Sequence, residues 1–165
     1  MEYKLTFRNH ISALSGLFTF TIILIITVLL IAEYDGYDQS LLVFFGVFYL
    51  LNLLPVLFIH FQYYNANKNT TLFVELEKSQ FTYKTNLAKT IIFSEIERID
   101  VYMLPSLYRG SNFQMMPYEG YHYAIIYTQN EKIIVTSLIV KNIVKELTNL
   151  GLDIRKHKCF FPYIK

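Results

Sequence analysis

Cysteine and glycine are scarce in this chain of 165 residues, and each scarcity excludes a class of site. The single cysteine, Cys159, cannot form a disulfide within the chain, which fits a reducing compartment. None of the six glycines stands in a GxGxxG or GxxxxGK arrangement, so the sequence has no glycine-rich phosphate loop. His157 and Cys159 supply only two of the four ligands that a closed zinc site needs, and no motif gives them a third group for catalysis. We therefore expect no catalytic residues, no metal and no cofactor, and a protein that is not an enzyme.

Charge is absent from two long apolar runs, Ile11 to Ala32 and Leu41 to Phe61. As a helix, the first run of 22 residues would reach about 33 Å, which is enough to cross a hydrocarbon core of roughly 30 Å. The link at residues 33–40 carries three acids and no base, and so short a connection makes the two helices antiparallel neighbours. A cleaved signal peptide is the alternative, but its apolar core is usually shorter than this run. The sequence predicts a membrane-embedded helical hairpin.

Basic residues at the two ends of the hairpin predict its orientation. Lys4 and Arg8 precede the first helix and Lys68 follows the second, and short Lys/Arg-rich segments stay on the cytoplasmic side. We expect a multi-pass protein of the cytoplasmic (inner) membrane with both termini in the cytoplasm. The expected division is a cytoplasmic segment at residues 1–10, a transmembrane hairpin at 11–65 with helices at about 11–32 and 41–61, and a cytoplasmic domain at 66–165.

The domain after the hairpin changes to a period of two, which is typical of β-strands. We expect about six strands in meander order, near residues 72–76, 81–85, 90–93, 96–104, 121–128 and 133–138. The period then returns to 3.6 over residues 139–150, which predicts an amphipathic helix with Gly151 as its left-handed cap. The predicted fold class is therefore a membrane α-helical hairpin plus an α+β soluble domain. Its antiparallel sheet would curl, or close into a barrel, with one C-terminal helix closing its end.

This order of elements resembles the pleckstrin-homology-like (PH-like) domains of bacterial membrane proteins. The resemblance rests on the segment IIFSEIERI at residues 91–99, on the strand pair from Tyr123 to Ser137 and on the closing helix. It implies a seven-stranded sheet plugged by a helix, and a scaffolding or binding role without catalytic residues. The six strands assigned above leave the seventh open, and residues 105–120 are one place for it.

Two segments of the domain are candidate contact sites for a partner or for lipid. The long irregular segment 105–120 combines basic, aromatic and flexible apolar side chains, which suit docking to a lipid interface or a protein. The tail from Arg155 combines basic residues with an aromatic end, which suits an anionic membrane surface. The candidate residues are Tyr108, Arg109, Phe113, Met115, Met116, Arg155, Lys156 and Lys158. In the alternative interpretation, the first segment covers the open edge of the sheet and the apolar end of the tail pairs along it.

The function that fits these features best is a membrane-anchored binding or scaffolding protein, whose domain contacts anionic lipid head groups or another membrane protein. Residues 66–165 carry 13 Lys and Arg against 9 Asp and Glu, too small an excess for a nucleic-acid site. Assembly of several copies is left open. The alternative function is a small transport or channel accessory subunit, in which the helices act and the domain regulates. That alternative needs a polar path, for which Asn52 and Pro55 in the middle of the second run are the first candidates.

Overall fold

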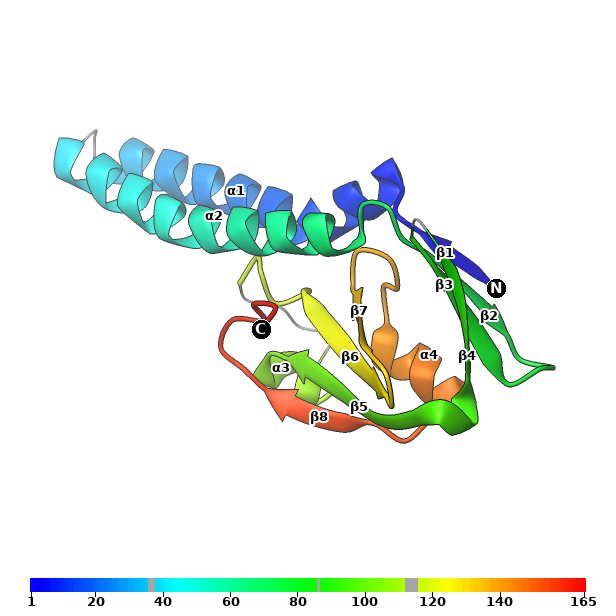
Figure 1. Ribbon diagram of the computed structural model, residues 1–165. Coiled ribbons are helices and arrows are strands. Elements are labelled where there is room, and N and C mark those ends of the chain that lie inside the picture. The colour runs from blue at the N-terminus through cyan, green and yellow to red at the C-terminus, as the bar shows by residue number, and fades with distance from the viewer. Residues whose placement is uncertain (36–37, 86, 112–115) are drawn as a thin grey trace.

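The computed structural model describes residues 1–35, 38–85, 87–111 and 116–165. Two long helices lie side by side along one edge of a domain that contains two four-stranded sheets (Figure 1). The helices are α1 (Phe7–Asp35), α2 (Gln39–Asn67), α3 (Pro105–Tyr108) and α4 (Ile143–Asn149), with a 3-10 turn η1 at Phe93–Glu95. The strands are β1 (Glu2–Lys4), β2 (Thr71–Glu75), β3 (Gln80–Lys84), β4 (Ala88–Ile92), β5 (Ile96–Met103), β6 (His122–Thr128), β7 (Lys132–Thr136) and β8 (Arg155–Lys158).

Strands β2 to β7 occupy the six segments predicted from the sequence. Their alternation places one set of side chains in the core, as in β2, where Leu72 and Val74 are buried between half-exposed neighbours. Segment 105–120 does not supply a further strand in its described residues, because Pro105 starts the short helix α3 instead. The two additional strands, β1 and β8, lie near the ends of the chain and are only three and four residues long.

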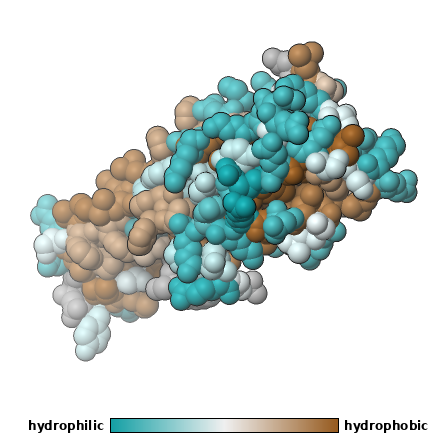
Figure 2. All heavy atoms as spheres, turned by 60° about the horizontal axis from the view of Figure 1, so that its bottom comes forward, coloured by the Kyte–Doolittle hydropathy of each residue, from teal (hydrophilic) through white to brown (hydrophobic). Residues whose placement is uncertain are grey.

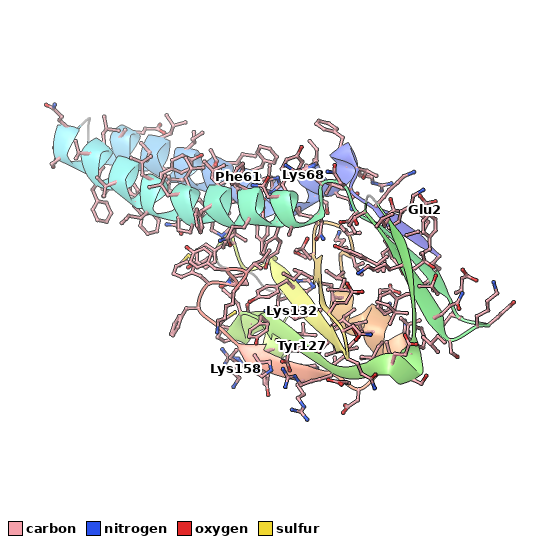
Figure 3. All side chains as sticks on the ribbon, in the orientation of Figure 1. Glu2, Phe61, Lys68, Tyr127, Lys132 and Lys158 are labelled. Carbon is pink, nitrogen blue, oxygen red and sulfur yellow. The ribbon has the colours of Figure 1, made fainter. Side chains whose placement is uncertain are left out.

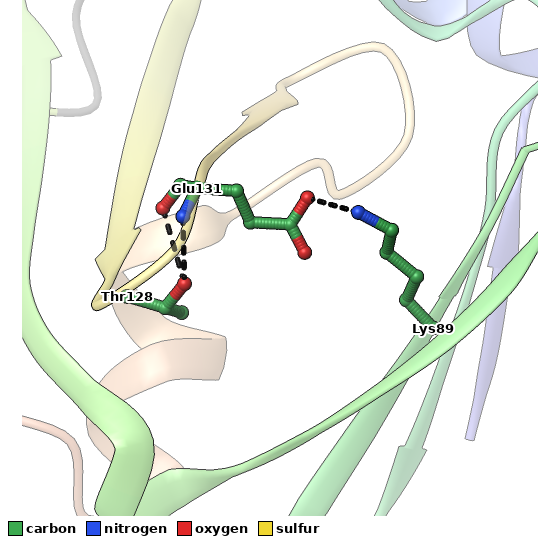
Figure 4. Close-up of polar contacts among 3 residues, drawn as sticks. All are labelled: Lys89, Thr128 and Glu131. Carbon is green, nitrogen blue, oxygen red and sulfur yellow. Dashed lines mark hydrogen bonds and ion pairs between the residues drawn. The ribbon is translucent and has the colours of Figure 1, made fainter.

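The eight strands form two separate sheets. The first has the order β1-β2-β3-β4 and is antiparallel throughout; the second has the order β7-β6-β5-β8, in which β8 runs parallel to β5. No ladder joins the two sheets within the described residues, so they do not close into a barrel. Lys89 on β4 pairs with Glu131 beside β7, and Glu131 also bonds Thr128 (Figure 4). An exposed ion pair of this kind contributes at most about 1 kcal/mol, so the main link between the sheets is apolar.

The apolar core lies between the facing sides of the two sheets. β5 contributes Ile99, Val101 and Met103, each at most 2% exposed, and the first sheet contributes Phe81 and Ile91. Burying one such side chain stabilises the fold by about 1.5–3 kcal/mol relative to leaving it in water.

Helix α4 is shorter than the predicted helix at residues 139–150. It begins only at Ile143, because the Asn142 side chain caps it by accepting a bond of 3.2 Å from the Lys145 N–H. Gly151 has φ +71° directly after the helix, which confirms the predicted left-handed cap. Ile143 and Leu147 join the core, so the helix packs against the sheets as its stripe predicted.

Strand β1 makes the helix pair an insertion between two strands of one sheet. Tyr3 pairs with Leu72 of β2 in antiparallel register, and the whole of α1 and α2 lies between these partners in the sequence. Tyr3 also donates a hydrogen bond of 2.9 Å to Glu146 on α4, and its pKa is raised to about 12 by burial and by that carboxylate. The chain therefore leaves the first sheet through α1 and returns to its neighbouring strand through α2.

The helix pair exposes most of its apolar side chains. α1 and α2 each have an apolar window long enough to cross a membrane, and only 6% and 17% of the residues in those windows are buried. Figure 2 shows this apolar surface at one end of the molecule, and most of the hydrophilic surface in that view lies over the rest of the molecule, where it is mixed with smaller apolar patches. A core helix of a water-soluble protein would bury such residues against its own fold.

Candidate functional site

The last turns of α2 are docked on the second sheet through a buried asparagine. Asn67 donates to the Ile134 carbonyl at 3.0 Å and accepts from the Thr136 N–H at 3.1 Å, so its amide pairs with β7 as a strand residue would. Its side chain is fully buried, which makes both bonds costly to lose. Residues Val56, Ile59 and Tyr63 of α2 are buried on the same side of the helix.

A chain of ring hydrogen bonds joins both helices to the domain. His10 of α1 lies 2.9 Å from His60 of α2 between ring nitrogens, and the second nitrogen of His60 lies 2.9 Å from the Tyr121 hydroxyl. Nearby, Asn9 donates to the Leu138 carbonyl at 2.6 Å. The base of the helix pair is thus fixed to the domain by directional contacts from both helices.

The C-terminal tail, residues 159–165, lies beneath α2 after the parallel strand β8 (Figure 1). The Tyr63 hydroxyl donates to the Pro162 carbonyl at 2.8 Å, and the Tyr123 hydroxyl donates to the Tyr163 carbonyl at 2.9 Å. The basic residues Arg155 to Lys158 thus pair along the sheet as β8, and the apolar end that follows them packs against α2. The sequence-based alternative had placed the apolar end on the sheet.

A basic cleft of about 1050 Å³ opens where α1 leaves the domain. One wall is the first turns of α1, from Arg8 to Gly16, and the other walls are α3, the residues around His122 and the start of α4. Small side chains line the α1 wall, and at Gly16 an added Cβ would approach the Pro117 carbonyl oxygen to 3.2 Å. Five cationic side chains border the cleft: Arg8, Arg109, Lys141, Lys145 and Lys156.

The charge of the basic cleft is of one sign. No carboxylate lies among the described residues that line it. His122 at its floor is neutral near pH 7, because burial lowers its pKa to about 4, against the opposing effect of its bond to the Gly120 carbonyl. Its other ring nitrogen accepts from the Ile143 N–H at 3.4 Å. A concave surface whose only charged side chains are cationic attracts anionic groups.

The structure brings three of the predicted site residues into the basic cleft: Tyr108, Arg109 and Lys156. Lys158 lies at the edge of the domain on β8, with its ammonium 4.5 Å from the centre of the Tyr108 ring (Figure 3). Arg155 borders a separate, smaller hollow near Gly151.

The remaining predicted residues do not add to the cleft. Met116 is half-buried and does not line it, and Phe113 and Met115 fall outside the described residues. Sequence reasoning missed Arg8, Lys141 and Lys145, because their segments meet segment 105–120 only in the folded chain. The one signal in the sequence that could have pointed to this site was that Lys141 and Lys145 are four residues apart, on the exposed side of the predicted helix.

Other polar groups of the domain, outside the basic cleft, make contacts within the fold. His157 bonds Asp100 at 3.0 Å, and Arg98 bonds the second carboxylate oxygen of Asp100 at the same distance. Burial raises the pKa of the Cys159 thiol, which keeps it in its weakly nucleophilic protonated form near pH 7.

Comparison with known proteins supports the architecture. A family model described as a PH domain matches residues 2–145. The chain belongs to the PH domain family. The match runs from β1 through both long helices into α4, and it confirms the PH-like resemblance seen in the sequence. No curated protein and no solved structure matches the chain. PH domains are typically non-enzymatic modules that bind lipids or proteins.

Proposed function

We propose that this protein is a membrane-anchored PH-domain binding module, in which α1 and α2 span the bilayer. The basic cleft would be the site that contacts a lipid head group or an anionic segment of a membrane protein. The observation that carries this proposal is the position of the cleft. Its α1 wall continues directly into the exposed apolar part of the same helix, where Phe18 and Ile22 are more than half exposed.

The length of the helices is consistent with one part in the bilayer and another part docked on the domain. Each of α1 and α2 has 29 residues and reaches about 43 Å, which exceeds the hydrocarbon core by roughly 13 Å. The excess lies at the domain end, where Tyr63 and Asn67 of α2 make their hydrogen bonds. The apolar remainder is long enough to cross.

Strand pairing supports the proposed topology. β1 and β2 are hydrogen-bonded neighbours, so a spanning hairpin between them has both of its ends on one side of the bilayer. Lys4, Arg8 and Lys68 at those ends favour the cytoplasmic side of the inner membrane. The termini and the domain would then share the cytoplasmic face.

The membrane anchor would hold the cations of the basic cleft close to the lipid head groups, where they attract anionic groups. A Lys or Arg close to an anionic leaflet gains about 1 kcal/mol, and the hairpin holds five such residues at one place. Binding of this kind requires no catalytic group, so we propose a role in local binding or scaffolding rather than catalysis.

The transport alternative finds less support. Asn52 is buried, but its amide donates to the Phe48 carbonyl of its own helix at 2.9 Å, so its polarity is used within α2. This intrahelical bond also differs from the interhelical bond expected for an isolated membrane asparagine. Thr21 and Tyr49 make an interhelical contact instead, at 3.2 Å.

The test compares two triple variants of the full chain that have equal loss of charge. Lys141→Gln, Lys145→Gln and Lys156→Gln together remove three cations from the basic cleft. Lys78→Gln, Lys84→Gln and Lys132→Gln remove three exposed cations that do not line it. Both proteins are purified from membranes after photocrosslinking, and the bound anionic lipid and crosslinked protein are measured.

For the cleft variant, we expect either the bound anionic lipid or the crosslinked protein to fall at least tenfold below wild type. For the control variant, both amounts should stay within twofold of wild type. Equal binding by all three proteins would contradict a binding role for the cleft. Release of the wild-type protein by alkaline carbonate would contradict the anchoring.

A further inference from the structure

Two phenylalanines of the C-terminal tail are displayed on the surface rather than buried. Phe160 is 86% exposed and Phe161 is 39% exposed, although the tail around them is closely packed. We name Phe160 and Phe161 the aromatic shelf. Neighbouring large apolar side chains that are exposed together favour contact with an apolar environment outside the chain.

The tail holds the aromatic shelf against α2. Phe161 stacks on Tyr163, with ring centroids 5.4 Å apart, and Tyr163 meets Phe58 of α2 edge-on at 5.1 Å. The Ile164 N–H donates to the Gln62 side chain at 3.2 Å. Together with the bonds to Tyr63 and Tyr123 described above, these contacts fix the tail at the level of residues 58–63 of α2.

That level coincides with the end of the apolar part of α2. The run from Leu41 to Phe61 has 21 residues, and about 20 helical residues cross the hydrocarbon core. A hairpin that enters the bilayer with its tip therefore leaves it near Phe58 to Gln62. Figure 1 shows that the helix pair projects beyond the domain on the side where the C-terminus lies, so the shelf is on the bilayer side of the domain.

We infer that the aromatic shelf inserts into the interfacial layer of the bilayer, beside the point where α2 emerges. The inference rests on the proposed membrane anchoring and adds a third point of attachment to the two helices. Phe side chains of interfacial segments insert at the boundary between headgroups and acyl chains, and Phe61, which is 62% exposed, lies on α2 three residues after Phe58. The domain is then held in one orientation on the membrane.

A fixed orientation has a consequence for the basic cleft. The shelf and the cleft both border the segment around Tyr118, since Phe161 packs on Tyr118 at 5.0 Å and the adjacent Pro117 lines the cleft. Insertion of the shelf would bring the cleft to the leaflet surface. Partners at the membrane would meet the cleft, and a soluble partner would meet the opposite side of the domain.

The chain contains no tryptophan, so a single substitution creates a unique fluorescent reporter. Phe160→Trp places it on the shelf, Phe44→Trp places it on the exposed surface of α2 near the tip of the helix pair, and Leu76→Trp places it on the turn after β2. Phe44 and Leu76 are both more than half exposed, so each tolerates the larger ring. The full-length variants are reconstituted in vesicles of phosphatidylcholine and phosphatidylglycerol, with and without brominated acyl chains.

We expect brominated lipid to quench Phe160→Trp at least twofold, with acrylamide quenching at least threefold weaker than for Leu76→Trp. If Phe160→Trp matches Leu76→Trp for both quenchers while Phe44→Trp is quenched by brominated lipid, the shelf is in water and the inference is wrong. If brominated lipid fails to quench Phe44→Trp, the anchoring itself is wrong. The two failures are therefore distinguishable.

Discussion

The two halves of α2 have similar apolar composition and opposite surroundings. In the half toward the tip, Phe44, Leu50 and Leu51 are all more than half exposed. In the half toward the domain, Val56 and Ile59 are fully buried against the sheet. Hydrophobicity alone therefore does not separate an exposed apolar segment from a docking segment; the hydrogen-bonding residues Tyr63 and Asn67 make the difference.

The largest effect on the contrast between the two halves should come from removing the hydrogen bonds by which Asn67, at the end of α2, docks on β7. Asn67→Ala leaves the buried Thr136 N–H and the Ile134 carbonyl without the amide, which should lower the free energy of unfolding by about 3 kcal/mol. Thermal unfolding of the full chain in detergent measures this. Asn65→Ala, on the exposed side of the same turn, is the control and should change stability by less than about 0.5 kcal/mol. Equal effects of the two changes would show that the hydrogen bonds of Asn67 do not hold α2 on the domain.

Lowering the pH should destabilise the domain on which α2 docks, through His122 of β6, and should not affect the part of α2 near the tip. The pKa of His122 is about 4 in the fold and 6.5 in a solvent-exposed chain, so the unfolded state takes up the proton first as the pH falls. Stability is therefore full above pH 6.5 and decreases below it, by about 2 kcal/mol between pH 7.5 and pH 5.

Thermal unfolding across this pH range checks the His122 prediction. His122→Asn should be less stable at pH 7.5, because it loses packing and the bonds to Gly120 and Ile143. It should also show a smaller decrease toward pH 5. An unchanged pH dependence in His122→Asn would assign the acid sensitivity to another group.

A smaller effect is expected from the bond between α2 and the C-terminal tail. Tyr63→Phe keeps the ring and removes the hydroxyl that donates to Pro162, which should cost about 1 kcal/mol. Tyr64→Phe changes the next residue, which lies on the exposed side of the helix, and should have little effect. Protease sensitivity of the tail provides a second readout, and it should rise only in Tyr63→Phe.

The smallest effect should come from Asn52, the polar residue of the half of α2 that we propose to span the bilayer. Asn52→Leu removes a side chain that bonds within its own helix, so stability in membranes should change by about 0.6 kcal/mol or less. Binding at the basic cleft should stay the same. A loss of cellular function with normal insertion and normal binding would instead favour the transport alternative.

The sequence contained most of the fold because its signals are periodic. Strands β2 to β7 and the cap at Gly151 follow from local patterns. β1 could not be predicted, since three residues show no period and their partner, β2, lies beyond two helices. β8 was hidden for a similar reason, because its Arg and Lys residues have a basic pattern rather than an alternating one.

The candidate site was only half visible in the sequence. Arg109 and Lys156 were found because they lie in unusual segments, whereas Arg8 was read only as a signal of topology. The cleft joins residues 8, 109, 145 and 156, and no local pattern connects such distant positions. The docking role of Asn67 was equally invisible, because its partners belong to β7.

The most direct test of the account is a nitroxide scan of exposed positions along α2 and at Lys68, the residue that follows it, in the Cys159→Ser protein, reconstituted in vesicles. Labels are placed singly at Leu50, Leu54, Phe61 and Lys68, and relaxation by oxygen is compared with relaxation by a water-soluble nickel chelate. The account predicts a high oxygen-to-nickel ratio at Leu50 and Leu54 and a decrease of at least tenfold toward Lys68, with the change near Phe61. A nickel accessibility at Leu50 equal to that at Lys68 would contradict a helix shared between the bilayer and the PH domain.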